Sequence, residues 1–115
     1  MIEQARIDAL RGEVVPDQSL LIGGRRVDPV ENDGPSEVIS PIDGRVLCTL
    51  ANGSAADVDR AVIASRRCFD HGDWSRAKPA ERKAKLLALA ELIERDALEI
   101  SVLGVRDNEI GRAHV

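Results

Sequence analysis

The chain has 115 residues, of which 43% are hydrophobic and 31% charged, and its formal net charge is −4. This length allows one domain with a modest core. The negative charge, with both signs mixed along the chain, argues against a nucleic-acid or anionic-membrane partner. No apolar run approaches the roughly 20 residues that span a bilayer.

Two further features of the composition limit the class of protein. Phe69 and Trp74 are the only aromatic residues, so aliphatic side chains must fill the core, each burying less area than a ring. Cys48 and Cys68 are too few for a disulfide framework or a zinc site. The first residues lack the apolar region of a signal peptide. We therefore expect a cytoplasmic protein.

Residues 1–19 are polar, with Ile7 and Leu10 as the only apolar pair at helical spacing, and predict a flexible leader. Residues 20–27 contain two short runs on either side of Gly23 and Gly24. A glycine pair tolerates the positive φ angles of a two-residue turn, so this stretch predicts a β-hairpin. The Pro-, Gly- and Asn-rich residues 29–36 predict a loop.

A second hairpin is predicted from residues 37–40 and 45–51. Pro41 suits the first central position of the connecting turn, and Gly44 can close it with a positive φ. Val46, Cys48 and Leu50 alternate on one face of the second strand. Residues 20–51 are thus expected to form antiparallel strands.

The apolar period changes after Gly53. Ser54 and Asp57 resemble a capping box, and a helix is expected to run from there to Gly72. Six residues at helical spacing define one face of this amphipathic helix: Val58, Ala61, Val62, Ser65, Cys68 and Phe69. We expect this face, including Cys68, to be buried, as we do the Cys48 face of the strand.

A second helix should open at Pro79 and Glu81, residue types favoured in a first turn. Its expected buried stripe comprises Leu86, Leu89, Ala90, Ile93 and Ala97. Asp96 with Glu99 signals a new cap, which predicts a third helix over about 97–106. Residues 54–108 are the helical part of a mixed α/β chain.

No constellation in the sequence predicts catalysis or cofactor binding. Buried cysteines usually act as small hydrophobic groups. His71 and His114 have no Cys, Asp or Glu at ligand spacing. The chain contains no nucleotide-binding glycine motif, P-loop or nucleophile elbow. From the residues alone we assign no catalytic and no cofactor-binding residue.

The order and spacing of five stretches carry a family resemblance. They are LLIGGRRVD (20–28), EVISPIDGRVLCTL (37–50), SAADVDRAVIASRRCFDHGDWS (54–75), KPAERKAKLLALAELIERDALEI (78–100) and RDN (106–108). Together they resemble the N-terminal segment of the NAD(P)-dependent aldehyde dehydrogenase superfamily, over about residues 20–108. The stretch from the aspartate before Trp74 to Lys83 is similar to the branch that oxidises γ-glutamyl-aminobutyraldehyde and betaine aldehyde.

The resemblance implies an oxidoreductase that converts a small aldehyde to a carboxylic acid with NAD or NADP. It also implies a homo-oligomer and the aldehyde dehydrogenase fold. The family's nucleophilic cysteine, general-base glutamate, oxyanion-hole asparagine and nucleotide-binding strands lie beyond this segment. Cys48 and Cys68 do not match the nucleophile's motif. The chain by itself is therefore expected to be inactive.

A monovalent-cation site is a further implication of the resemblance. In some family members, backbone carbonyls before the strand-connecting turn and an aspartate near the end of the segment hold K⁺ or Na⁺. The matching positions are Val38, Ile39 and Asp107. This sequence departs from the family pattern at Ser40 and Glu109, which stand where Asn and Gly are usual. Alternatively, Asp107 only caps the end of the last helix.

Residues 109–115, EIGRAHV, do not continue the family pattern and look like one reading frame of a sequencing adapter. We expect this tail to be non-native, and a truncated paralogue with a divergent tail is the alternative. If neighbouring segments are missing, a stripe containing Leu86, Ile93 and Ile100 should be partly exposed.

A free-standing interaction module is the alternative function. Its hairpins would extend a partner's sheet.

Overall fold

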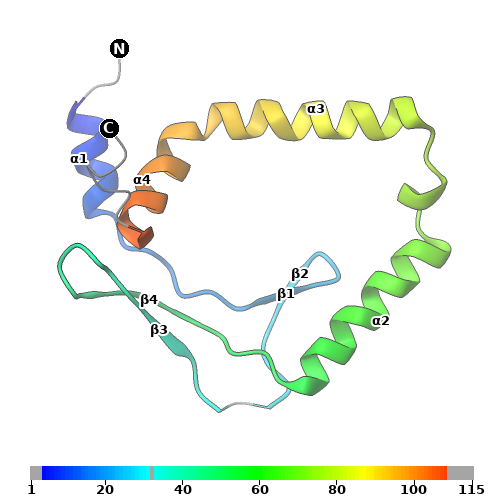
Figure 1. The fold of residues 1–115 in the computed structure, drawn as a ribbon, viewed down its shortest axis with the longest axis horizontal. Helices are drawn as coiled ribbons and strands as arrows, with labels where there is room; N and C mark the ends of the chain where they lie inside the picture. Colours follow the sequence, from blue (N-terminus) through cyan, green and yellow to red (C-terminus); the bar gives the residue numbers. More distant parts are fainter. Residues whose placement is uncertain (1–3, 32, 109–115) are drawn as a thin grey trace.

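The computed structural model describes residues 4–31 and 33–108. The elements follow in the order α1 (Gln4–Gly12), β1 (Leu20–Ile22), β2 (Arg25–Val27), β3 (Ser36–Ile39), β4 (Val46–Leu50), α2 (Ala55–His71), η1 (Trp74–Arg76), α3 (Pro79–Arg95) and α4 (Ala97–Asn108). In Figure 1 they form an open ring: α3 runs across the top between α2 and the α1–α4 pair, and the hairpins lie along the bottom. The predicted plan of antiparallel hairpins followed by helices is confirmed.

The first hairpin pairs β1 with β2, with Leu20 opposite Val27. Gly23 and Gly24 have φ angles of 60° and 75°, and positive φ at both central residues is what a tight hairpin turn needs. Gly23 lies against α2: a Cβ added to it would be 3.7 Å from the Ala64 Cβ. The turn therefore sets how closely the hairpin can approach the helix.

The second hairpin pairs β3 with β4, and its register shifts between Val38 and Ile39. Such a bulge leaves one residue of the opposite strand unpaired. The outer side of β4 is also occupied, since the Gln18 N–H donates to the Thr49 carbonyl (2.9 Å) and the Ala51 N–H donates to the Gln18 carbonyl (2.8 Å). These hydrogen bonds thus hold the segment around Gln18 against the second hairpin.

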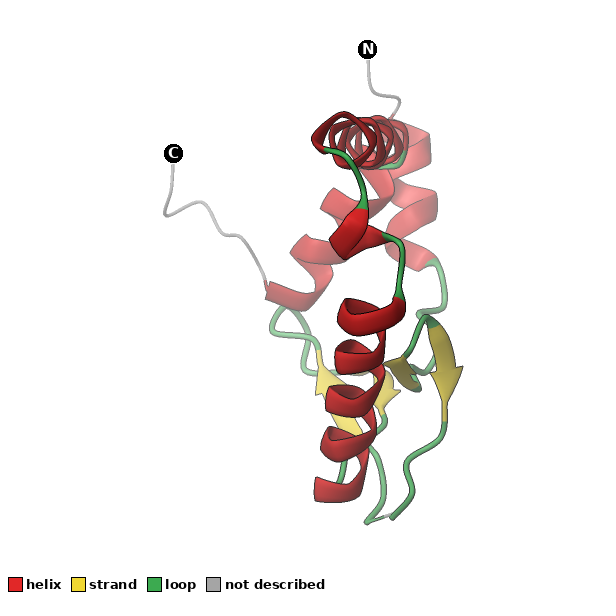
Figure 2. Cartoon of the chain, turned by 90° about the vertical axis from the view of Figure 1, so that its right-hand side faces the viewer, coloured by secondary structure: helices red, strands yellow, loops and turns green. Residues whose placement is uncertain are grey.

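The predicted helix boundaries hold closely. Ser54 caps α2 and forms the reciprocal capping box with Asp57, and Pro79 stands in the first turn of α3. The break expected near Asp96 separates α3 from α4. Helix α2 contacts the first hairpin through β1, and in Figure 2 it stands in front of the strands.

Helix α1 lies within residues 1–19, for which the sequence predicts a flexible leader. It packs against α4. The Arg106 guanidinium donates to the carbonyls of Leu10 (3.2 Å) and Glu13 (2.8 Å), and Arg6 forms an ion pair with Glu99. These partners are more than ninety positions apart, so a short polar segment gains a helix from contacts that local patterning cannot reveal.

The core is small. Within the described ranges, the buried residues are Cys48, Ser40 and Asp57. The radius of gyration is 18.2 Å, against about 13 Å for a compact chain of this length. Leu86, Ile93 and Ile100 are each at least half exposed. The expectation of a buried stripe on α3 is therefore wrong, and the partial exposure expected in the absence of neighbouring segments is observed. No helix within the described residues is long and apolar enough to cross a membrane.

The tail 109–115 and His114 lie outside the described residues.

Candidate functional site

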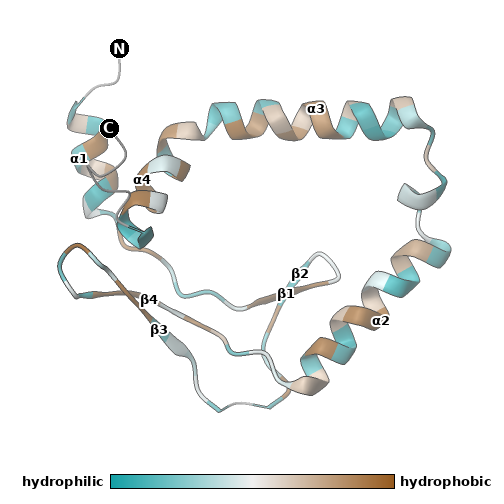
Figure 3. Ribbon diagram, viewed as in Figure 1, coloured by the Kyte–Doolittle hydropathy of each residue, from teal (hydrophilic) through white to brown (hydrophobic). Residues whose placement is uncertain are grey.

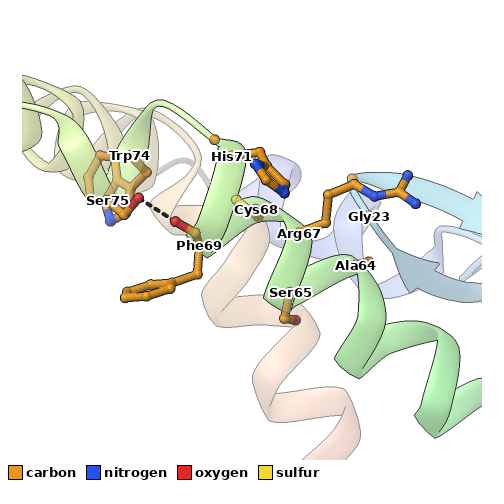
Figure 4. A pocket seen from close by; sticks show the side chains of 11 residues that line it. Gly23, Ala64, Ser65, Arg67, Cys68, Phe69, His71, Trp74 and Ser75 are labelled. Atoms are coloured by element: carbon orange, nitrogen blue, oxygen red, sulfur yellow. Dashed lines mark hydrogen bonds between the residues drawn. The ribbon is translucent and has the colours of Figure 1, made fainter.

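A hollow of about 850 Å³ lies between the first hairpin's turn and the C-terminal half of α2. Ala64, Cys68 and His71 line it from α2, and Trp74 lines it from η1. Figure 4 shows His71 on the side of α2 that faces Gly23, while the Phe69 ring lies on the opposite side of the helix. The lining of the hollow thus includes a thiol, an imidazole and an indole ring.

The hydrogen bonds around this hollow are structural. The Ser75 hydroxyl donates to the Phe69 carbonyl (2.6 Å; dashed in Figure 4), and the Gly72 N–H donates to the Cys68 carbonyl (2.8 Å). Among the residues lining it, the Cys68 thiol and the His71 imidazole are not hydrogen-bonded to each other. A nucleophile activated by a base needs that contact, so these hydrogen bonds fix η1 to the end of α2 and do not activate a thiol.

The prediction that Cys68 lies on a buried face is wrong, whereas Cys48 is buried as predicted. The hairpin turn reaches α2 at Ala64, one helical turn before Cys68. Beyond that point the hollow opens, so the thiol stays exposed.

The most connected polar group is the buried carboxylate of Asp57, whose side chain is only 3% exposed. It accepts hydrogen bonds from the Ser54 N–H and hydroxyl (both 2.9 Å), from the Val30 N–H (3.1 Å) and from the Arg60 guanidinium (3.0 Å). These donors hold the pKa of Asp57 below its ordinary value. The Ser54 N–H has the largest effect, and burial opposes it. A carboxylate with this many donors stays ionised and bound in place.

Asp57 therefore joins the start of α2 to the loop between the two hairpins. The capping box is visible in the sequence, and the spacing of Asp57 and Arg60 is a helical i, i+3 pair. Val30 lies 27 positions from Asp57 in the sequence, so no local sequence pattern predicts this contact.

The residues predicted to hold a cation lie in two elements. Val38 is half-buried and Ile39 is 49% exposed, on β3 at the register shift, whereas Asp107 is exposed in the last turn of α4. A hollow of about 300 Å³ that contains both Ile42, from the β3–β4 turn, and Arg106 places that turn beside the end of α4. Among the described residues, no group of three or more His, Cys, Asp and Glu side chains is placed to hold a metal ion.

Comparison with known proteins identifies the family. Residues 29–113 match the Aldehyde dehydrogenase family. The chain is 40% identical over 88 residues to the NADP/NAD-dependent aldehyde dehydrogenase PuuC of Escherichia coli (strain K12), a match that covers 76% of this chain and 18% of that relative.

Solved structures agree with the sequence match. A γ-glutamyl-γ-aminobutyraldehyde dehydrogenase from Burkholderia cenocepacia J2315 has a TM-score of 0.81 at 34% identity, over 91% of this chain and 21% of its own. An indole-3-acetaldehyde dehydrogenase in complex with NAD⁺ has a TM-score of 0.83 at 33% identity, over 92% of this chain and 21% of its own. The chain belongs to the aldehyde dehydrogenase family, and it spans about a fifth of the length of these relatives.

Proposed function

We propose that this chain is a framework segment of an enzyme that oxidises a small aldehyde to a carboxylic acid with NAD⁺ or NADP⁺. The family match over residues 29–113 carries the proposal. The fold similarity over about nine-tenths of the chain supports it. Relatives named for NAD and NADP support the cofactor class. The complete protein would be cytoplasmic, as its cysteine content leads us to expect, and a homo-oligomer, as the resemblance implies.

In this proposal the segment holds structural elements in place and contributes no catalytic group. The Asp57 contacts hold the start of α2 to the loop between the hairpins, and the Arg106 contacts hold α4 against α1. Thiolate attack on the aldehyde and hydride transfer to the nicotinamide would both use groups from other parts of the enzyme.

A chimera tests this function. Residues 20–108 of this chain would replace the matching segment of PuuC, and reduction of NAD⁺ or NADP⁺ would be followed with a panel of aldehydes that includes aminoaldehydes and indole-3-acetaldehyde. We expect the chimera to oxidise aldehydes and the 115-residue chain alone to show no turnover. A folded but inactive chimera would contradict the framework role. Turnover by the chain alone would contradict the assignment of chemistry to other segments.

The cation site at Val38, Ile39 and Asp107 is a second proposal. Carbonyl and carboxylate oxygens suit K⁺ and Na⁺, and the nearness of the β3–β4 turn to the end of α4 supports it. In the chimera, K⁺ or Na⁺ should raise the melting temperature more than choline at equal ionic strength. An Asp107→Asn variant should lose that difference. An equal response of both proteins, or no response to K⁺ and Na⁺, would overturn the site.

A further inference from the structure

Residues 4–18 connect two parts of the ring, the end of α4 and the second hairpin. Helix α4 packs chiefly against α1, and β4 packs chiefly against β3. The stretch 4–18 touches both parts, since α1 lies on α4 and Gln18 forms an isolated parallel bridge with Leu50 of β4. In Figure 1 it leaves the end of α1 and runs toward β1 alongside the second hairpin.

The first anchor of this stretch lies between α1 and α4. The Arg106 guanidinium donates to the carbonyls of Leu10 (3.2 Å) and Glu13 (2.8 Å). These groups lie at the C-terminal end of α1, where the last carbonyls lack partners within the helix and a cation is favoured. Arg6 adds an ion pair with Glu99. A helix of nine residues is marginal on its own, and in Figure 3 hydrophilic and hydrophobic bands alternate along it. Helix α1 is therefore helical only while it is docked.

The second anchor lies on the outer side of β4. The Thr49 N–H donates to the Asp17 carboxylate (2.7 Å), and the Thr49 carbonyl accepts from the Gln18 N–H (2.9 Å). The Ala51 N–H donates to the Gln18 carbonyl (2.8 Å). The Gln18 side chain also donates to the Pro16 carbonyl (2.7 Å), and the fixed φ of proline further stiffens the approach to β4.

The link between the two anchors is short. Residues 13–16 separate Gly12, the end of α1, from Asp17. An extended chain advances at most about 3.6 Å per residue, so Gly12 stays within about 18 Å of Asp17. Val15 is half-buried and lines a hollow of about 160 Å³ with Leu103 of α4. The link therefore packs on α4 itself and holds the two anchors near each other.

We propose that residues 4–18 act as a strap that closes the ring between α4 and the second hairpin, so that docking of α1 on α4 and pairing of residues 17–18 with β4 stabilise each other. Through the short link, each contact raises the effective concentration of the other. The coupling is reciprocal, because linkage between two sites has the same free energy in both directions. The strap goes beyond the proposed function, since it needs neither aldehyde nor cofactor.

Amide hydrogen exchange of the 115-residue chain tests the strap at a distance from the substitution. Arg106→Gln should speed exchange of the Thr49 and Ala51 amides by about three- to tenfold, the scale of one lost hydrogen bond, although these amides bond to residues 17 and 18 and not to Arg106. The Val30 amide is the internal reference and should not change. Arg95→Gln, which removes an exposed arginine at the end of α3, is the matched control and should leave all three amides unchanged.

Lengthening the link distinguishes a strap from two independent contacts. About ten Gly and Ser residues inserted after Val14 would keep both anchors but lower their effective concentration for each other. Val14 is 91% exposed, so the insertion disturbs no packed side chain. In the lengthened chain, Arg106→Gln should still speed exchange in α1 but should no longer affect Thr49 and Ala51.

Three results would overturn the strap. The first is Arg106→Gln with fast exchange in α1 and unchanged Thr49 and Ala51 amides. The second is an effect on those amides that survives the insertion. If the Val30 amide also exchanges faster, the reverse experiment decides: Asp17→Asn should speed exchange in α1, whereas Asp59→Asn, at another exposed position, should not. Unchanged α1 exchange in Asp17→Asn is the third result. None of these measurements uses turnover, so the proposed function stands or falls separately.

Discussion

Replacing Asp57 by asparagine should detach the start of α2 from the loop between the hairpins. The carboxylate accepts from the N–H groups of Ser54 and Val30 and from Arg60. Asparagine has one acceptor oxygen, and its NH₂ group would face one of these donors. A buried donor left without a partner costs more than the bond itself contributes.

The measurement is amide hydrogen exchange. In Asp57→Asn, the Ser54 and Val30 amides should exchange faster by on the order of tenfold, the size of a lost helix cap. Asp59→Asn removes an exposed carboxylate from the same helix and should leave both amides unchanged. Equal exchange in the two variants would show that Asp57 does not join these elements.

The same carboxylate predicts a pH dependence. Its pKa in the folded chain is lowered, above all by the Ser54 N–H, so it lies below the value of about 3.9 in an unfolded chain. A lowered pKa means that the stabilisation is fully present above the unfolded value and is lost as pH falls through the folded one. Protection of the Val30 amide should therefore fall below about pH 4, and Asp57→Asn should remove this acid-dependent part.

Polar substitution of the exposed apolar residues of α3 should make the isolated chain more soluble instead of unfolding it. Leu86 and Ile93 are 59% and 50% exposed. Truncating a buried Leu or Ile costs about 2–5 kcal/mol, but residues this exposed have little burial to lose. Leu86→Gln with Ile93→Gln should keep the helix content while lowering aggregation and the binding of a hydrophobic dye.

Val102→Gln is the opposing control. Val102 is half-buried on α4 and lines hollows together with Ile7 and Leu10 of α1. A polar group there should loosen α1 from α4 and increase dye binding. Sedimentation and dye fluorescence measured together check both variants. If the Leu86, Ile93 variant loses helix content, these two side chains are covered in solution, and their exposure in the structure is contradicted.

The same measurement separates the two functions raised by the sequence. A free-standing module should be soluble and unfold cooperatively without any substitution. A framework segment should aggregate until its apolar faces are changed. The short strands of three to five residues and the occupied side of β4 offer little free edge for extending a partner's sheet.

The sequence by itself determined where the strands and most helices begin and end. Gly23 and Gly24 predict the hairpin turn, Ser54 and Asp57 the start of α2, and Pro79 the start of α3. These features depend on backbone freedom and on hydrogen bonds between residues a few positions apart. The family resemblance likewise came from ordered local motifs.

Only the tertiary structure decided which faces meet. The apolar spacing of α2 predicts that the Val58 and Phe69 face is buried, but the hairpin packs on the Ala64 face because the tight glycine turn comes close to a small side chain. Helix α1 exists through Arg106, far along the chain. Periodicity identifies an apolar face, but its partner depends on residues distant in sequence, and the apolar residues of α2 and α3 stay exposed in the described fold.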